Sequence, residues 1–173
     1  MKPGDFGEVT FDFTICDNPG LVWLTGGLVE ASENGLTEPE REDEQEKEGV
    51  VELLDELQVT VWYDNGDNIL EATETYVTQR SVTDDGNPSS SAVNLTGGHR
   101  IVTRGTLREV LADLSTGRGI PLDGIPSDIP RDCFAPTPTI HYLGVSWELP
   151  VDHGNEIQTD SVTFDLGFDT EQC

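Results

Sequence analysis

"EVTFDFTIC", at residues 8–16, carries the clearest structural pattern in this sequence. Apolar and polar side chains alternate along it, with the period of two expected for a strand that has one buried and one wet face. Its apolar side chains are Val9, Phe11, Phe13 and Ile15. A second stretch, "SVTFDLGFDT" at residues 161–170, alternates in the same way. Its apolar side chains are Val162, Phe164, Leu166 and Phe168. The two strands are therefore expected to share one core.

Between these two stretches the sequence predicts further strands, rich in the Val, Thr and aromatic residues that strands favour. They are expected near residues 21–30, 58–63, 74–81, 99–104 and 139–149. Long polar loops separate them, at residues 37–48, 84–91 and 119–138. Short strands joined by long loops are typical of a β-sandwich. The length of 173 residues fits one domain spanning residues 1–173.

Two short helices interrupt the strand pattern. The segment "TLREVLADLSTG", at residues 106–117, opens with a capping box formed by Thr106 and Glu109. One stripe of that segment is apolar, which predicts an amphipathic helix. The segment "GVVELLDELQ", at residues 49–58, predicts a shorter helix that leads directly into the next strand. The acidic segment 37–48 has no apolar residues to bury and is expected to be a solvated loop with a frayed helix start.

The charge of the chain is its most unusual property. There are 34 acidic residues and 9 basic ones, which gives a net charge of −25, and Lys2 and Lys47 are the only lysines. Nucleic acid is excluded as a natural partner, because phosphate binding requires Lys and Arg. The acids are spread along the chain, as in proteins adapted to molar salt, where the Debye length falls to about 3 Å and self-repulsion is screened. An acidic protein of ordinary salt tolerance is the alternative.

No motif predicts an enzyme. The three histidines, at 99, 141 and 153, have no zinc-site spacing, and no nucleophile elbow or phosphate-binding loop is present. The sequence has no stretch of about 18 apolar residues that could cross a bilayer. No signal peptide precedes Lys2. The prediction is a non-enzymatic chain with no cofactor and no transmembrane segment.

The stretch "DNGDN", residues 64–68, is rich in the carboxylate and amide oxygens that a hard cation such as calcium binds. The spacing does not match an EF-hand loop, since Gly66 falls where a ligand is needed. A tight type I′ hairpin turn on Asn65 and Gly66 explains the same residues. The prediction is a turn and no metal.

Three cysteines leave at least one thiol unpaired within the chain. Cys16 and Cys173 end the two alternating strands that are expected to share a core, so a Cys16–Cys173 disulfide is predicted. Three free thiols are the alternative. Asn94 begins an Asn-Leu-Thr sequon in a Ser-rich segment that is expected to be a loop, which makes it a candidate glycosylation site.

The chain resembles the haloarchaeal secreted proteins that carry SipW-type signal peptides, relatives of the TasA and camelysin fibre-forming proteins. The resemblance runs nearly end to end. The stretches that carry it are "KPGDFGEVTFDFTICDNPGLVWL", "ENGLTEPE", "LQVTVWYD", "GTLREVL", "RDCF" and "NEIQTDSVTFDLGF". It implies a jelly-roll β-sandwich, export to the cell surface or the extracellular space, and in some members assembly into filaments.

The chain departs from the family pattern at three places. Family members have a signal peptide and one or two strands ahead of the Lys-Pro-Gly-Asp turn, so the N-terminal strand or strands are expected to be missing here. They also carry a cysteine in the loop after "WYD" and another where Tyr142 stands. The resemblance therefore implies that Cys133 has lost its partner.

The function expected from these observations is that of a structural protein of the cell surface or extracellular matrix. Its subunits, identical or related, would associate by β-strand addition in high salt, because an incomplete sandwich leaves backbone groups unpaired. The groove is expected along the two alternating apolar faces described above. The alternative is a monomeric surface module that binds glycans or cations through the acidic loops 37–48 and 84–91.

Overall fold

The computed structural model describes residues 1–44, 46–82, 88–96, 100–124, 131–152 and 154–173. The strands are β1 Phe6–Phe13, β2 Gly20–Glu33, β3 Gln58–Asp64, β4 Thr73–Val82, β5 Pro88–Thr96, β6 Ile101–Thr106, β7 Ile120–Pro121, β8 His141–Glu148 and β9 Asp160–Gln172. The helices are α1 Glu38–Arg41, α2 Leu53–Glu56 and α3 Leu107–Ser115. The predicted mainly β fold class is confirmed.

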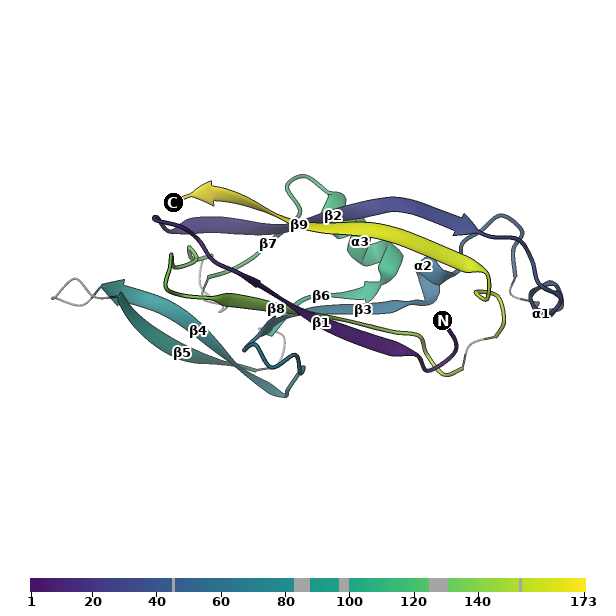
Figure 1. Ribbon diagram of the computed structural model, residues 1–173, viewed down its shortest axis with the longest axis horizontal. Helices are drawn as coiled ribbons and strands as arrows, with labels where there is room; N and C mark the ends of the chain where they lie inside the picture. The colour runs from purple at the N-terminus through teal and green to yellow at the C-terminus, as the bar shows by residue number, and fades with distance from the viewer. Residues whose placement is uncertain (45, 83–87, 97–99, 125–130, 153) are drawn as a thin grey trace.

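Two antiparallel sheets face each other to form a sandwich (Figure 1). The strand order is β1-β8-β3-β6 in the first sheet and β7-β2-β9 in the second. The chain crosses between the two sheets from β1 to β2, from β2 to β3, from β6 to β7, from β7 to β8 and from β8 to β9, as in a jelly-roll-like sandwich. The antiparallel β-sandwich expected from the strand pattern is therefore present.

Strands β4 and β5 form a separate two-stranded hairpin. It extends away from the two sheets (Figure 1). This is a correction to the predicted loop at 84–91, because residues 88–91 belong to β5. The remainder of that predicted loop, residues 84–87, lies outside the described residues.

The register of the sheets places the predicted apolar faces inward. In the first sheet Val9 pairs with Val145, and Phe11 pairs with Leu143. Directly paired residues share a face of a sheet, and both of these partners are buried. In the second sheet Phe168 pairs with the buried Leu24 in the same way. The period of two in the sequence therefore identified the correct face of both strands.

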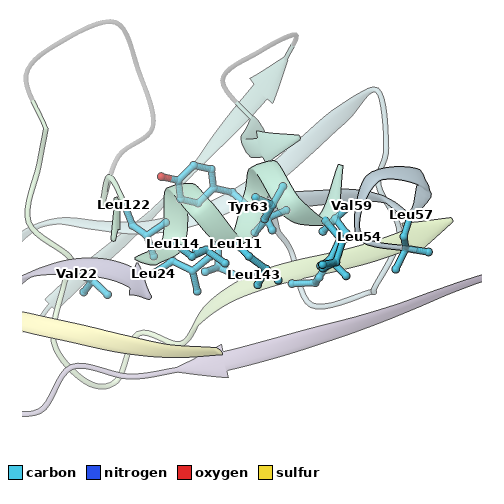
Figure 2. Close-up of a cluster of buried hydrophobic side chains, with 14 of the residues drawn as sticks. Val22, Leu24, Leu54, Leu57, Val59, Tyr63, Leu111, Leu114, Leu122 and Leu143 are labelled. Carbon is cyan, nitrogen blue, oxygen red and sulfur yellow. The ribbon is translucent and has the colours of Figure 1, made fainter. Parts of the chain in front are cut away.

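Helix α3 closes one long side of the sandwich. Its capping box forms as predicted, with the Glu109 N–H donating to the Thr106 hydroxyl at 3.3 Å and the Thr106 N–H donating to the Glu109 carboxylate at 2.9 Å. The helix follows β6 of the first sheet and packs on β2 of the second. Figure 2 shows Leu111 and Leu114 among core side chains from both sheets, including Val22, Leu24 and Leu143.

Three helices are present in the described part of the chain, where the sequence predicted two. The predicted helix at 49–58 is reduced to the single turn of α2. The extra helix, α1, lies in the acidic segment 37–48 and begins with its own capping box, formed by Thr37 and Glu40. No described helix is long and apolar enough to span a membrane.

The predicted Cys16–Cys173 disulfide is wrong. Cys173 bonds to Cys133, and Cys16 is a free and exposed thiol. The reason is the pairing around Gly20, which pairs with Gln172 of β9 and forms a β-bridge with Phe134. Each of these residues is the chain neighbour of one of the bonded cysteines. The implication that Cys133 has no partner is wrong for the same reason.

Candidate functional site

The side of the sandwich away from α3 is bounded by two edge strands, β1 and β9. Within the described residues β1 pairs only with β8, and β9 pairs only with β2. Each strand therefore presents one row of backbone N–H and C=O groups that no described strand pairs. In Figure 1 the two strands run along the same side of the molecule, one in each sheet. An edge of this kind is a template for pairing with another strand.

The two predicted apolar sets lie on these two strands, and the structure brings them together. The rings of Phe13 and Phe168 are 4.8 Å apart, which joins the two sheets at one end of the open side. Four inward-facing side chains of the two sets nevertheless remain more than a third exposed. They are Val9 at 37%, Phe11 at 38%, Phe164 at 39% and Phe168 at 39%. Phe13, Ile15, Val162 and Leu166 are partly buried against the core.

Two apolar cavities lie between the two sheets on this side, and Val145 lines both of them. The smaller, of about 70 Å³, is lined by Phe11, Leu24, Val61, Leu143, Val145, Leu166, Gly167 and Phe168. The larger, of about 230 Å³, is lined by Met1, Leu53, Leu57, Val59, Leu107, Val145, Trp147, Val162 and Phe164. We call this open side, with its two cavities, the edge groove. Its shape and lining suit the alternate apolar side chains of an inserted strand.

Trp147 is the groove residue that the sequence prediction missed. It pairs with Gly7 of β1, and a Cβ atom on Gly7 would stand 2.4 Å from the indole ring. Gly7 therefore makes room for the ring beside the larger cavity. The signal was present in the sequence, because Leu143, Val145 and Trp147 alternate with a period of two in the predicted strand 139–149.

The acidic segment 37–48 is more ordered than predicted. The carboxylate of Glu40 is buried, and it accepts hydrogen bonds from the N–H groups of Thr37 at 2.6 Å and Thr159 at 2.7 Å. Burial alone would raise the pKa of Glu40, but these hydrogen bonds outweigh it and lower the pKa below its usual value. Glu40 therefore ties α1 to the segment that precedes β9.

Near α1, three carboxylates from different segments have raised pKa values. Burial is the main cause for Glu46, Glu52 and Asp160, and the charges of neighbouring carboxylates add to it. Asp160 also accepts a hydrogen bond from the N–H of Leu53, at 2.9 Å, at the first turn of α2. Burial therefore disfavours the charged form of each of these three carboxylates.

The described residues contain no group of three or more His, Cys, Asp or Glu side chains arranged to hold a metal ion. His141 lies in the core, where its Nε2 is 3.0 Å from the carbonyl oxygen of Ala135. Burial lowers the pKa of His141, so the ring is neutral at pH 7. His99 and His153 lie outside the described residues.

The turn predicted at Asn65 and Gly66 is wrong. Gly66 has a positive φ of 100°, but Asn65 does not have the positive φ that a type I′ turn requires. Strand β4 does not pair with β3, so residues 65–72 form a longer loop between two strands of different sheets. The second residue with a positive φ in this loop is Asn68, at 62°.

The sequon residue Asn94 lies in strand β5, where the sequence predicted a loop. Its side chain is exposed, as is that of Thr96, while Leu95 between them is buried. The asparagine is therefore on the accessible face of the hairpin, and its glycosylation stays a prediction.

No family model matches the chain, and no curated protein matches it.

Proposed function

We propose that this chain is a non-enzymatic structural protein of the cell surface or extracellular matrix, whose copies assemble by strand addition in the edge groove. The observation that carries the proposal is that both edge strands, β1 and β9, lie on one open side, where two apolar cavities lie between the sheets. A strand from a second copy could pair with the free backbone of either edge. Its alternate side chains would then fill the cavities.

The exposed apolar surface of the groove is expected to be buried by a binding partner. Monomeric soluble proteins keep contiguous apolar patches small, and larger ones mark interaction sites. The groove is apolar, whereas the chain as a whole has a net charge of −25. At low salt, repulsion between such acidic surfaces favours separate monomers. High salt screens that repulsion and strengthens apolar burial. Assembly is therefore expected in molar salt, which is consistent with the proposed halophilic source.

Export to the cell surface is proposed from the resemblance to secreted fibre-forming proteins. The Cys133–Cys173 disulfide supports it, because disulfides persist in oxidising environments outside the cytosol. The assembly partner that fits best is a second copy of this chain or a related subunit.

The test is the oligomeric state of the protein in molar KCl, measured by sedimentation velocity over a range of protein concentrations. The wild type is expected to form oligomers. The variant Phe164→Glu places a charge in the large cavity and should remain monomeric. Thr163→Glu is the matched control, because it adds the same charge one residue away on an exposed side chain of the same strand. Circular dichroism checks that both variants fold.

A wild type that stays monomeric at high protein concentration would overturn the assembly proposal and favour a monomeric binding module. Equal loss of assembly in the two variants would show that added charge, and not the groove, controls association.

A further inference from the structure

Two buried carboxylates lie at the two ends of loop 65–72, which joins β3 to β4. Asp64 is 1% exposed, and Glu74 is 0% exposed. Asp64 faces outward from the first sheet, since Tyr63 before it points into the core. The position is therefore on the opposite face of that sheet from the edge groove. Carboxylates are almost never fully buried unless they are paired or bind a metal.

Each of these carboxylates has one oxygen without a hydrogen-bond partner. The Oδ2 atom of Asp64 accepts from the Thr10 hydroxyl at 2.7 Å and from the Asn68 N–H at 3.2 Å, but its Oδ1 atom has no partner. The Oε1 atom of Glu74 accepts from the Glu71 N–H at 2.6 Å, and its Oε2 atom has no partner. No described Lys or Arg forms an ion pair with either group.

The Thr10 hydroxyl links β1 to loop 65–72. Its oxygen lies 2.7 Å from Asp64 Oδ2 and 2.9 Å from Asn68 Oδ1. The hydroxyl carries one proton, which it donates to Asp64, and a flip of the Asn68 amide would turn its NH2 toward Thr10 as a donor, so these three groups require no cation among themselves. The oxygens that no hydrogen reaches are Asp64 Oδ1 and Glu74 Oε2. A cation bound by these two oxygens would satisfy their lone pairs.

The electrostatics of Glu74 agree with a missing positive charge. Burial is the main cause that raises its pKa, and the charges of Asp64, Asp67 and Glu71 raise it further. Arg100 donates to the carbonyl of Ala72, at 3.0 Å, and no ion pair joins it to Glu74 among the described residues.

We propose that Asp64, Asn68 and Glu74 bind one calcium ion on the outer face of the first sheet. Calcium accepts carboxylate, amide and backbone oxygens in flexible geometry, and an irregular loop such as 65–72 supplies them. Magnesium fits less well, because it demands near-ideal octahedral geometry and gives up its waters reluctantly. The ion would fasten loop 65–72 to β1 through Thr10 and so fix the base of the β4–β5 hairpin. This proposal does not depend on strand addition.

The test is terbium luminescence with the full chain in molar KCl, with excitation through tryptophan. Trp62 is buried on the same face of β3, two residues before Asp64, and is the expected sensitiser. We expect a saturable signal with one ion per chain, displaced by calcium at about 10⁻⁴–10⁻³ M, the range of sites with few charged ligands. Magnesium should displace terbium only at a concentration about tenfold higher than that of calcium. Molar KCl suppresses diffuse binding to the acidic surface.

The site variant is Glu74→Gln, which keeps the shape of the side chain and removes its charge. It should weaken terbium and calcium binding by about tenfold or more, the loss of roughly 1.4 kcal/mol. Asp12→Asn is the matched control, because Asp12 is an exposed acid two residues from Thr10 on the same face of β1. It should leave binding unchanged. If Glu74→Gln does not fold by circular dichroism, Asn68→Ala in the loop takes its place.

Three results would overturn the calcium site. They are no saturable signal in the wild type, equal weakening in the site variant and the Asp12→Asn control, or full affinity in the site variant. A wild type without calcium binding, together with a Glu74→Gln variant that is more stable than the wild type, would show that the two carboxylates share a proton instead.

Discussion

The rings of Phe13 and Phe168 meet at a centroid distance of 4.8 Å and join the two sheets at one end of the edge groove. Phe13 also contacts Phe134, at 5.3 Å, and His141, at 5.4 Å. This aromatic cluster limits how far the sheets can separate. The smaller cavity is lined by Phe168 of this cluster, and the larger one lies beside Trp147.

The first prediction concerns that contact. A double-mutant cycle with Phe13→Leu and Phe168→Leu should give a coupling free energy of about 0.5–1.5 kcal/mol, as aromatic pairs do. The measurement is the free energy of unfolding by denaturant in molar KCl. Phe13→Leu combined with Phe164→Leu is the control pair, because no ring contact joins those two residues among the described contacts. Additive effects for Phe13 and Phe168 would contradict the contact.

The disulfide gives a second prediction. Cys133→Ser should lower the free energy of unfolding by about 2–5 kcal/mol, because the bond closes a long loop and so restricts the unfolded chain. Cys16→Ser is the matched control and should have little effect, since Cys16 is free and exposed. Thiol labelling of the oxidised wild type under denaturing conditions should find one reactive cysteine. Three reactive cysteines would refute the bond.

Glu40 gives a third prediction. Glu40→Gln should destabilise the protein by about 1.5–3 kcal/mol at pH 7, because glutamine offers one acceptor oxygen in place of two charged ones. Glu38→Gln, an exposed change in the same helix, should be nearly neutral. The pKa of Glu40 is lower in the folded state than in the unfolded state. Its contribution is therefore present above the ordinary pKa and is lost as the pH falls through the lowered value. A thermal-unfolding series from pH 7 to pH 3 measures this.

Glu52 gives a fourth prediction, because its pKa is shifted in the opposite direction to that of Glu40. Its pKa is raised in the folded state, mainly by burial and also by the charge of Asp160. The folded protein therefore holds more protons than the unfolded chain between the ordinary and the raised pKa, and stability falls as the pH rises through that window. Glu52→Gln should increase the free energy of unfolding at pH 7 by about 0.5–2 kcal/mol. The gain should disappear at pH 4, and a gain that persists there would refute the cause given.

The net charge gives the last prediction. The melting temperature should rise when KCl is increased from about 0.1 M to about 1 M, because the Debye length falls from about 10 Å to about 3 Å and repulsion at −25 is screened. Differential scanning fluorimetry measures the shift. A melting temperature that stays flat or falls with salt would count against a surface adapted to high salt.

Local sequence patterns predicted the strands and the helix whose conformation is set by residues close together in the sequence. Alternation at Val9, Phe11 and Phe13 predicted a strand and its inward face, because the strand backbone turns successive side chains to opposite faces. The Thr106 and Glu109 capping box predicted where α3 begins, because its hydrogen bonds join residues only three positions apart. Helix α2 was predicted too long at both ends: it begins at Leu53, and the strand pairing of Gln58 and Val59 limits it at its end.

Long-range contacts decided the rest. Which cysteine bonds to Cys173 depends on the bridge between Gly20 and Phe134, residues more than a hundred positions apart, and no local pattern encodes that pairing. The burial of Asp64 likewise depends on β1, because the Thr10 hydroxyl of that strand donates to the Asp64 carboxylate. The two alternating stretches of the sequence predicted that β1 and β9 each bury one face in the core. Only the order of strands in each sheet placed both at edges on one side and left the edge groove open. Side-chain alternation is a property of each strand's own backbone, whereas strand neighbours are chosen by the packing of the whole chain.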